Sequence, residues 1–323
     1  MDIVLYTTIF VLGTIIGSFL NVIINRYGKE SIQGRSHCES CAHTLSPLEL
    51  IPLLSFFFLR GRCVQCNAPV SFQYSFVELL TGDLFLLSFL KFGFSVEFVF
   101  SIIVWSLLII IAVYDFKHTI IPDEIVFSFI FIAFIRIIFL YGIKGLFTGD
   151  GFLYVLSGIL FFLPFFLLWW YSKGEWIGLG DGKLALGIGF FLGLQGGLSA
   201  IILSFWIGAI VSLVLLFFSR FLKGKNLLFK DREITGSGHE YDRTGEPASG
   251  ARSYPARTSS FESDDSQSQN DLIRPEGSDD DLLLGAKVLT MKSEIPFGPF
   301  LIFGTALVFF FGVSVIDFSI FVS

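Results

Sequence analysis

The sequence has little charge. Only 15% of its 323 residues are Asp, Glu, Lys or Arg, whereas 53% are hydrophobic. A soluble domain needs more charge to cover its surface, so a soluble globular protein is excluded. The short alternating segments of a membrane β-barrel are also lacking. Runs of about 18 or more apolar residues recur instead, and as helices they can cross about 30 Å of hydrocarbon. The sequence therefore predicts an all-α, polytopic membrane protein.

The apolar runs predict about eight transmembrane helices. They lie at about 3–24, 74–92, 96–114, 124–142, 152–172, 184–194, 197–221 and 295–318. The first run has neither a basic segment before it nor a small-residue cleavage site after it, so we expect a retained helix and not a signal peptide. Between the sixth and seventh runs, Gly193, Gly196 and Gly197 predict only a tight turn.

Composition also divides the chain into five segments. A first transmembrane helix (1–25) precedes a polar block (26–73), which holds every cysteine. A helical core (74–222) follows, then a polar loop (223–293) and the last helix (294–323). The loop is rich in Ser, Asp and Gly and lacks apolar periodicity, so we expect disorder, either as a solvated insertion or as a regulatory tail.

The net charge of −6 says little about partners. The acidic part of the polar loop carries all of it, so no acidic or basic partner follows, and we expect no nucleic-acid partner. Positive charge does predict the orientation. With the amino terminus outside, the inner segments before the last loop hold 8 Lys and Arg and the outer ones 2. The polar block then faces the cytoplasm.

Cysteine is scarce, and its spacing is specific. The only four are Cys38, Cys41, Cys63 and Cys66, in two CxxC pairs. Two such pairs can supply the four sulfur ligands of a tetrahedral zinc site, and thiols stay reduced in the cytoplasm. The alternative is two redox-active pairs or free thiols. A block this small has little core, so a metal would supply much of its folding energy. We therefore predict a small cytoplasmic zinc-binding domain.

Two aspartates lie where apolar runs meet polar sequence. Asp115 ends the third span in "IIIAVYDFKHTIIPDE", and Asp181 begins the sixth in "GLGDGKL". Ionisable residues in or near spans are functional candidates. Both lie at predicted cytoplasmic helix ends, so a packed bundle could bring them together. Two adjacent carboxyl groups come to share a proton, and one can then activate water while the other hydrogen-bonds a peptide carbonyl. This is aspartic-protease chemistry.

The residues around Asp181 have candidate supporting roles. Gly178, Gly180 and Gly182 could leave the backbone free in a non-helical turn that a substrate strand approaches. No strand precedes them and P-loop spacing is absent, which excludes phosphate and dinucleotide motifs. Lys183 is either a positive-inside anchor or a charge that steadies Asp181.

Other ionisable residues have structural interpretations. Asp123 follows Pro122 and is expected to cap the fourth span. Glu78 and Asp83 lie on different faces of the second span, and one of them is a candidate partner for Arg136.

Seven motifs together resemble one family. In order they are "GSFLNVIINR" (17–26), the two CxxC pairs, "LELIPLLSFFFLRGRC" (48–63), "VELLTG" (77–82), "YDFKHTIIPD" (114–123), "GLGDGKL" (178–184) and "IPFGPFL" (295–301). This order is similar to that of the bacterial type IV prepilin peptidases and covers nearly the whole chain except about 223–290. Two departures are Glu39, where proline often follows the first cysteine, and Tyr27, where proline is common.

The resemblance implies a function and its residues. Family members are inner-membrane aspartic proteases of the GxGD type, which remove the leader of prepilins and pseudopilins of type IV pili and type II secretion systems at the cytoplasmic face. Those with the cysteine domain also N-methylate the new terminus with S-adenosylmethionine. By position, the catalytic residues fall on Asp115 and Asp181, and Zn²⁺ on the four cysteines.

Two alternatives belong to other classes. A non-catalytic membrane assembly factor would use the zinc domain as a hook for partners. An ion-coupled transporter would carry protons on its membrane acids and would show internal repeats and broken helices near the midplane. No convincing repeat is present, and the two key aspartates lie at helix ends. The sequence favours the peptidase, and it indicates no oligomeric state.

Overall fold

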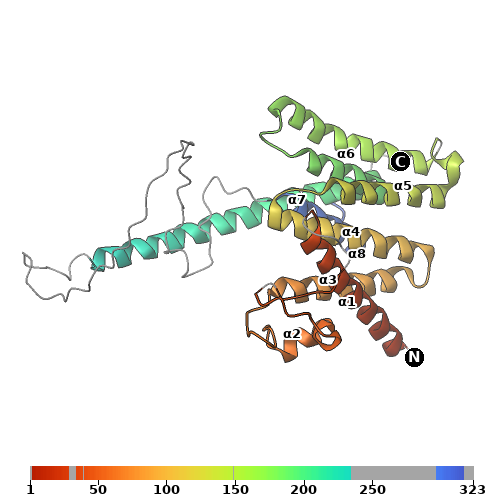
Figure 1. The fold of residues 1–323 in the computed structure, drawn as a ribbon. Coiled ribbons are helices and arrows are strands. Elements are labelled where there is room, and N and C mark those ends of the chain that lie inside the picture. Colours follow the sequence, from red (N-terminus) through yellow and green to blue (C-terminus); the bar gives the residue numbers. More distant parts are fainter. Residues whose placement is uncertain (1, 29–33, 39, 148, 234–295, 316–323) are drawn as a thin grey trace, which may run out of the picture. The chain divides into compact units, whose positions relative to one another are not determined.

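The computed structural model describes residues 2–28, 34–38, 40–147, 149–233 and 296–315. It divides into one unit of residues 1–213 and 294–323 and a second of residues 214–293. The first unit is a helical bundle with the cysteine-containing segment attached (Figure 1). Within the described ranges the only β pairing is two isolated bridges, both in that segment. The predicted all-α class is confirmed.

Apolar sequence sets the bounds of the long helices. They are α1 (Asp2–Arg26), α3 (Phe72–Phe92), α4 (Val96–His118), α5 (Asp123–Gly145), α6 (Asp150–Ser172), α7 (Leu179–Glu233) and α8 (Gly298–Phe311). Short pieces η1 (Pro47–Leu50) and α2 (Leu54–Phe58) lie between α1 and α3. The serine caps of α3 and α4 accept backbone N–H groups at their first turns, as N-caps do.

Five helices of the described chain are long and apolar enough to cross a membrane. They are Ile3–Arg26, Val96–His118, Asp123–Gly145, Asp150–Ser172 and Leu179–Phe218. The last is 40 residues long, longer than one crossing needs, and its backbone leaves helical geometry at Gly193 (φ 74°). The predicted break between the sixth and seventh runs lies at this glycine. The protein is a multi-pass membrane protein, and the full count of eight spans stays a prediction.

The predicted polar loop begins later than expected. Helix α7 continues to Glu233, so residues 223–233 are helical, and "KGKNLLFKDRE" consists mainly of residues that favour helix. The remainder of the predicted loop, and the start of the predicted last span, lie outside the described residues.

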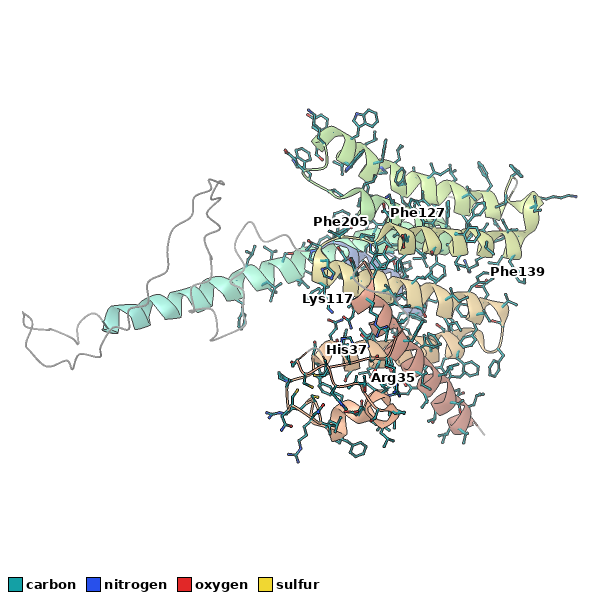
Figure 2. The ribbon with its side chains drawn as sticks, in the orientation of Figure 1. Arg35, His37, Lys117, Phe127, Phe139 and Phe205 are labelled. Carbon is teal, nitrogen blue, oxygen red and sulfur yellow. The ribbon has the colours of Figure 1, made fainter. Side chains whose placement is uncertain are left out.

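Aromatic and β-branched side chains fill the bundle core. Trp105 on α4 is fully buried and packs edge-on against Phe309 of α8, with ring centroids 5.6 Å apart. Phe191 of α7 stacks on the same Phe309 at 4.8 Å. Outward-facing aromatic residues such as Phe127 and Phe139 on α5 remain exposed (Figure 2). Exposed apolar side chains are expected where lipid covers the outer face of the helices.

Close helix packing depends on glycine. A Cβ atom on Gly189 of α7 would lie 2.5 Å from the Cα atom of Gly158 on α6, so the two backbones touch at this point. Small residues allow this approach between membrane helices.

The partly buried side chain of Arg136 has a different partner from the one predicted. Its guanidinium donates to both carboxylate oxygens of Glu97, at 2.8 and 3.3 Å, and to the carbonyl of Phe191. Glu78 accepts the backbone N–H of Leu53 instead. The pairing of Arg136 with the second span was therefore wrong, because Glu97 begins α4 at the depth where Arg136 lies on the antiparallel neighbour α5.

Candidate functional site

The two CxxC pairs fold into two copies of the same knuckle. In each, the backbone N–H of the first cysteine donates to a carbonyl five residues later, at 2.9 Å, and an isolated bridge flanks the pair. In each, the residue after the second cysteine is left-handed: Ala42 at φ 57° and Asn67 at φ 56°. The matching atoms are Cys38 N with His43 O and Cys63 N with Ala68 O.

The four sulfur atoms converge on one point. All lie within 4.8 Å of one another, with Cys38 Sγ 3.8 Å from Cys66 Sγ and Cys41 Sγ 4.0 Å from Cys63 Sγ. A tetrahedral zinc with Zn–S bonds of about 2.3 Å separates its sulfur ligands by about 3.8 Å. The backbone N–H groups of Ser40 and Cys41 lower the pKa of the Cys38 thiol to about 6, which favours the thiolate that binds metal. The cluster fits a metal ion.

Neither neighbouring histidine joins this cluster. The His43 ring pairs with Glu49, Nε2 to Oε2 at 3.4 Å, and Glu49 also accepts the backbone N–H of Ser46 at 2.7 Å. The metal-ligating set found among the described residues contains only the four cysteines.

Asp115 lies in the last turn of α4 and is almost fully buried, with 4% of its surface exposed. Its carboxylate accepts the backbone N–H of Gly298, the first residue of α8. The contact is tight, since a Cβ atom on Gly298 would lie 2.5 Å from Asp115 Oδ2. Figure 1 shows α8 beside α4. The free N–H groups at a helix start suit a carboxylate.

Asp181 lies in the first turn of α7 and is only partly buried. Its carboxyl group is near enough to that of Asp115, 66 positions earlier in the chain, for the two charges to interact. Ile121 lies in the connection from α4 to α5. It packs against Gly180, the residue before Asp181, and against Gly298, whose N–H bonds Asp115. The structure places the two aspartates at the same end of the bundle, and their catalytic role stays a prediction.

The glycines around Asp181 differ from the prediction. Only Gly178 lies outside the helix, directly before α7, while Gly180 and Gly182 are helical. A Cβ atom on Gly180 would lie 2.9 Å from Ile121 Cβ, and one on Gly182 would lie 3.1 Å from Phe165 Cβ. These two glycines therefore let α7 begin close against its neighbours. The expectation of a non-helical turn across all three glycines was wrong. Helix α7 begins at Leu179, and the close contacts of Gly180 and Gly182 with neighbouring elements accompany this early start.

Lys183 pairs with a different acid from the one considered. Its Nζ donates to Asp123 Oδ1 at 2.6 Å and lies 5.1 Å from the centre of the Phe127 ring. Asp123 is the first residue of α5. The N-cap position is occupied by Pro122, and the Asp123 side chain makes no capping hydrogen bond. The capping role predicted for Asp123 was wrong. The ion pair instead joins the starts of α5 and α7, two residues from Asp181.

Two parts of this site were missed from the sequence. Gly298 belongs to the motif "IPFGPFL", and Ile121 belongs to "YDFKHTIIPD". Neither residue has a predicted role from the sequence. A glycine directly before proline at the start of an apolar run was the available signal for a close backbone approach.

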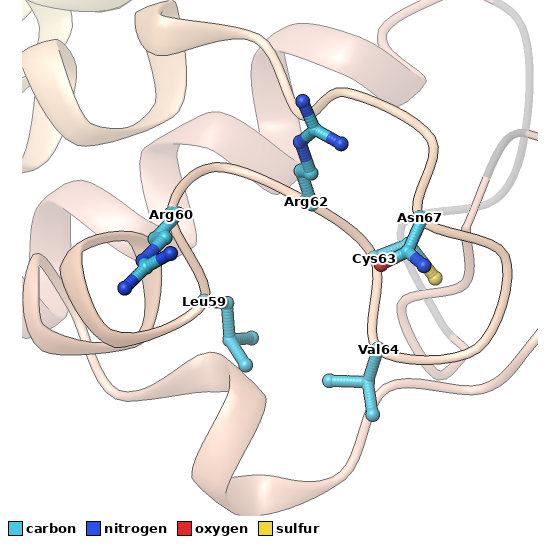
Figure 3. A pocket seen from close by; sticks show the side chains of 6 residues that line it. All are labelled: Leu59, Arg60, Arg62, Cys63, Val64 and Asn67. Atoms are coloured by element: carbon cyan, nitrogen blue, oxygen red, sulfur yellow. The ribbon is translucent and has the colours of Figure 1, made fainter.

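The site therefore contains one buried carboxyl group, Asp115, and one more accessible carboxyl group, Asp181, close enough for their charges to interact. Such pairs divide the roles of acid and base between two environments. A pocket of about 580 Å³ lies elsewhere, on the cysteine segment, and its lining includes neither aspartate (Figure 3).

Two family models match the chain. The bacterial peptidase A24 N-terminal domain matches residues 11–92, and the type IV leader peptidase family matches residues 102–213. The two matches contain all four cysteines and both aspartates, respectively. No solved structure matches this chain.

Curated relatives share one name, prepilin leader peptidase/N-methyltransferase. That of Myxococcus xanthus is 36% identical over 211 residues, which cover 64% of this chain and 62% of the relative. That of Bacillus subtilis is 35% identical over 237 residues, covering 71% and 90%. That of Aeromonas hydrophila is 28% identical over 256 residues, covering 69% and 86%. On these matches the chain belongs to the type IV leader peptidase family.

Proposed function

We propose that this protein is a membrane aspartic endopeptidase with Asp115 and Asp181 as its catalytic pair. It removes the leader peptide of type IV prepilins and pseudopilins and N-methylates the new terminus. The observation that carries the proposal is that the two residues come from different helices at one end of the bundle, where Ile121 packs against both Gly180 and Gly298. Family membership and the relatives' shared name support it.

The pair would hydrolyse a peptide bond without a covalent intermediate. The ionised carboxyl group takes a proton from water, and the oxygen of that water attacks the scissile carbonyl carbon. The protonated carboxyl group hydrogen-bonds the carbonyl oxygen, and a proton then passes to the leaving amine as the C–N bond breaks. The N–H of Gly298 fixes the Asp115 carboxylate, while the more exposed Asp181 is accessible to a substrate.

The proposed location is the bacterial inner membrane, with the site and the cysteine segment facing the cytoplasm. The excess of Lys and Arg in the corresponding loops supports this orientation. Asp115 ends α4 and Asp181 begins α7, on the side of the bundle assigned to the cytoplasm.

The four cysteines would hold Zn²⁺ in a structural role. All four tetrahedral positions are then taken by sulfur, so the metal keeps no open position for substrate. Among the described residues 34–38 and 40–71 only Cys63 is buried, so the segment has little core and the metal would hold the two knuckles together.

The methyltransferase half requires S-adenosylmethionine and rests on the relatives' names. We expect purified protein, given a prepilin and S-adenosylmethionine labelled in its methyl group, to shorten the substrate and transfer label to it. Mass spectrometry of the product reads both reactions together. Cleavage with label only at background would remove the methyltransferase; label on an uncut substrate would remove the peptidase.

Substitution of Gly298 tests the support of Asp115. In Gly298→Ala the new methyl group would lie 2.5 Å from Asp115 Oδ2, so the carboxylate must move. A displacement of a catalytic group by about 1 Å can slow catalysis by about 100-fold, and initial rates of leader removal would measure this loss. Gly208→Ala is the matched control, because its Cβ would meet only ordinary contacts, the nearest at 3.5 Å. Equal rates for the two variants would contradict the role given to Gly298.

A further inference from the structure

The cysteine segment carries an exposed apolar stretch that its metal site does not use. Residues 47–58, which include η1 and α2, are called the apolar stretch below. Leu48, Phe57 and Phe58 expose 76, 79 and 75% of their surface, and Leu50, Ile51 and Leu54 are also exposed. So many large apolar side chains on one short stretch of a surface mark an interaction site.

The stretch is held firmly against the bundle. Glu78 of α3 is buried, and its Oε2 accepts the backbone N–H of Leu53 at 2.8 Å. Glu78 also bonds the side chain of Ser18 on α1. Leu53 has the left-handed φ of 61°, a conformation that costs energy for leucine and persists where neighbours enforce it. The bundle therefore fixes which way the stretch faces.

The exposed surface continues onto helix α3. The ring of Phe56 lies 6.0 Å from that of Phe72, and Phe72 lies 6.5 Å from Phe76. Phe72 and Phe76 are the first exposed aromatic residues of α3, and α3 packs along the membrane-spanning helix α1. Figure 1 shows α2 beside the beginning of α3. The apolar stretch thus continues the exposed apolar surface of α3, beside the end of α1 where the Asn21 amide donates to the Tyr74 carbonyl.

Charge next to the stretch fits an anionic surface. Arg60 lies two residues after the end of α2 and is exposed. From residue 34 to residue 71 the sequence has three arginines against Glu39 and Glu49, and Glu49 is paired with His43. Figure 3 shows the Arg60 and Arg62 side chains pointing in different directions.

We propose that the apolar stretch lies in the interfacial layer of the bilayer, with Arg60 among anionic lipid headgroups. Short amphipathic segments bind there through buried apolar area and attraction to anionic lipids. The stretch lies at the depth where the membrane-spanning helix α1 ends, because Asn21 of α1 bonds the first turn of α3. The bond between Glu78 and the Leu53 N–H then holds the stretch against α3. The segment with the four cysteines is then fixed to the lipid surface and does not move freely in solvent.

Photo-crosslinking in reconstituted membranes tests the proposal. The full chain with p-benzoylphenylalanine at position 57 is placed in vesicles of phosphatidylglycerol and phosphatidylcholine and illuminated. We expect lipid adducts by mass spectrometry, with a yield about tenfold or more above that for the same probe at Gln65, given the gain from burying an aromatic side chain. Gln65 is exposed at the tip of the second knuckle. Position 58 serves as a second site if the first variant is not monodisperse.

The lipid preference tests the charge. We expect Arg60→Gln to lower the ratio of phosphatidylglycerol to phosphatidylcholine adducts at position 57 by about fivefold, and Arg62→Gln to leave it unchanged. Adducts to a second copy of the chain, or to an added prepilin in place of lipid, would assign the stretch to a protein partner and overturn the proposal. Equal lipid yields at positions 57 and 65 would also overturn it.

Discussion

Replacing Asp115 or Asp181 by asparagine is expected to abolish leader removal, with a fall in rate of about 1,000-fold or more. Asparagine keeps the size of the side chain but can neither take a proton from water nor share one with its partner. Both residues are needed because they form one pair. The Gly298 N–H holds the Asp115 carboxylate in place, and the charge of Asp115 interacts with the carboxyl group of Asp181. The measurement is the initial rate with a prepilin in detergent or proteoliposomes.

The control for this pair is Asp150→Asn. Asp150 is exposed and begins α6, at the end of the bundle opposite the two aspartates. We expect wild-type rates from it. The asparagine variants should accumulate in the membrane at wild-type levels with unchanged helix content, since a neutral amide in place of a buried carboxylate removes no packed atoms. Cleavage retained by either variant would remove that residue from the active site.

The second large effect concerns the metal. We expect purified protein to contain about one zinc per chain and Cys63→Ser to lose it. Cys63 is the buried member of the four, and metal binding supplies much of the folding energy of so small a unit. Without the metal, residues 34–71 should become sensitive to limited proteolysis while the bundle stays intact. Elemental analysis and the digestion pattern measure the two consequences.

Ser40→Ala is the matched control for the metal site. It lies inside the first knuckle, and only its backbone N–H contacts Cys38, so zinc content should not change. Full zinc occupancy in Cys63→Ser would contradict four-sulfur ligation. Wild-type protein without metal, and with two disulfides by mass, would support the redox alternative.

The sequence was most informative where the physical constraint is local. Apolar runs have to be helical in lipid, and the described helices lie where those runs are. The CxxC spacing predicts four sulfur atoms close together, and the four sulfur atoms do cluster in the structure. The resemblance drawn from seven motifs is confirmed by the family matches.

Prediction from sequence failed where the answer depended on how helices rotate and pack. Arg136 pairs with Glu97, and Lys183 pairs with Asp123. Each ion pair joins two different helices, so it depends on how those helices pack. Spans that are apolar on every side carry no pattern that tells which face points inward. The helical state of Gly180 and Gly182 has the same origin, since the contacts with Ile121 and Phe165 come from other elements.

The central claim is that Asp115 and Asp181 act as one catalytic unit, and the double variant tests it most directly. Leader removal is measured for Asp115→Asn, Asp181→Asn and both together under the same conditions. Residues that act as a unit show strongly non-additive losses, so we expect all three proteins to share the same background rate. Two moderate single losses that multiply in the double variant would show that the aspartates act independently and would contradict the account.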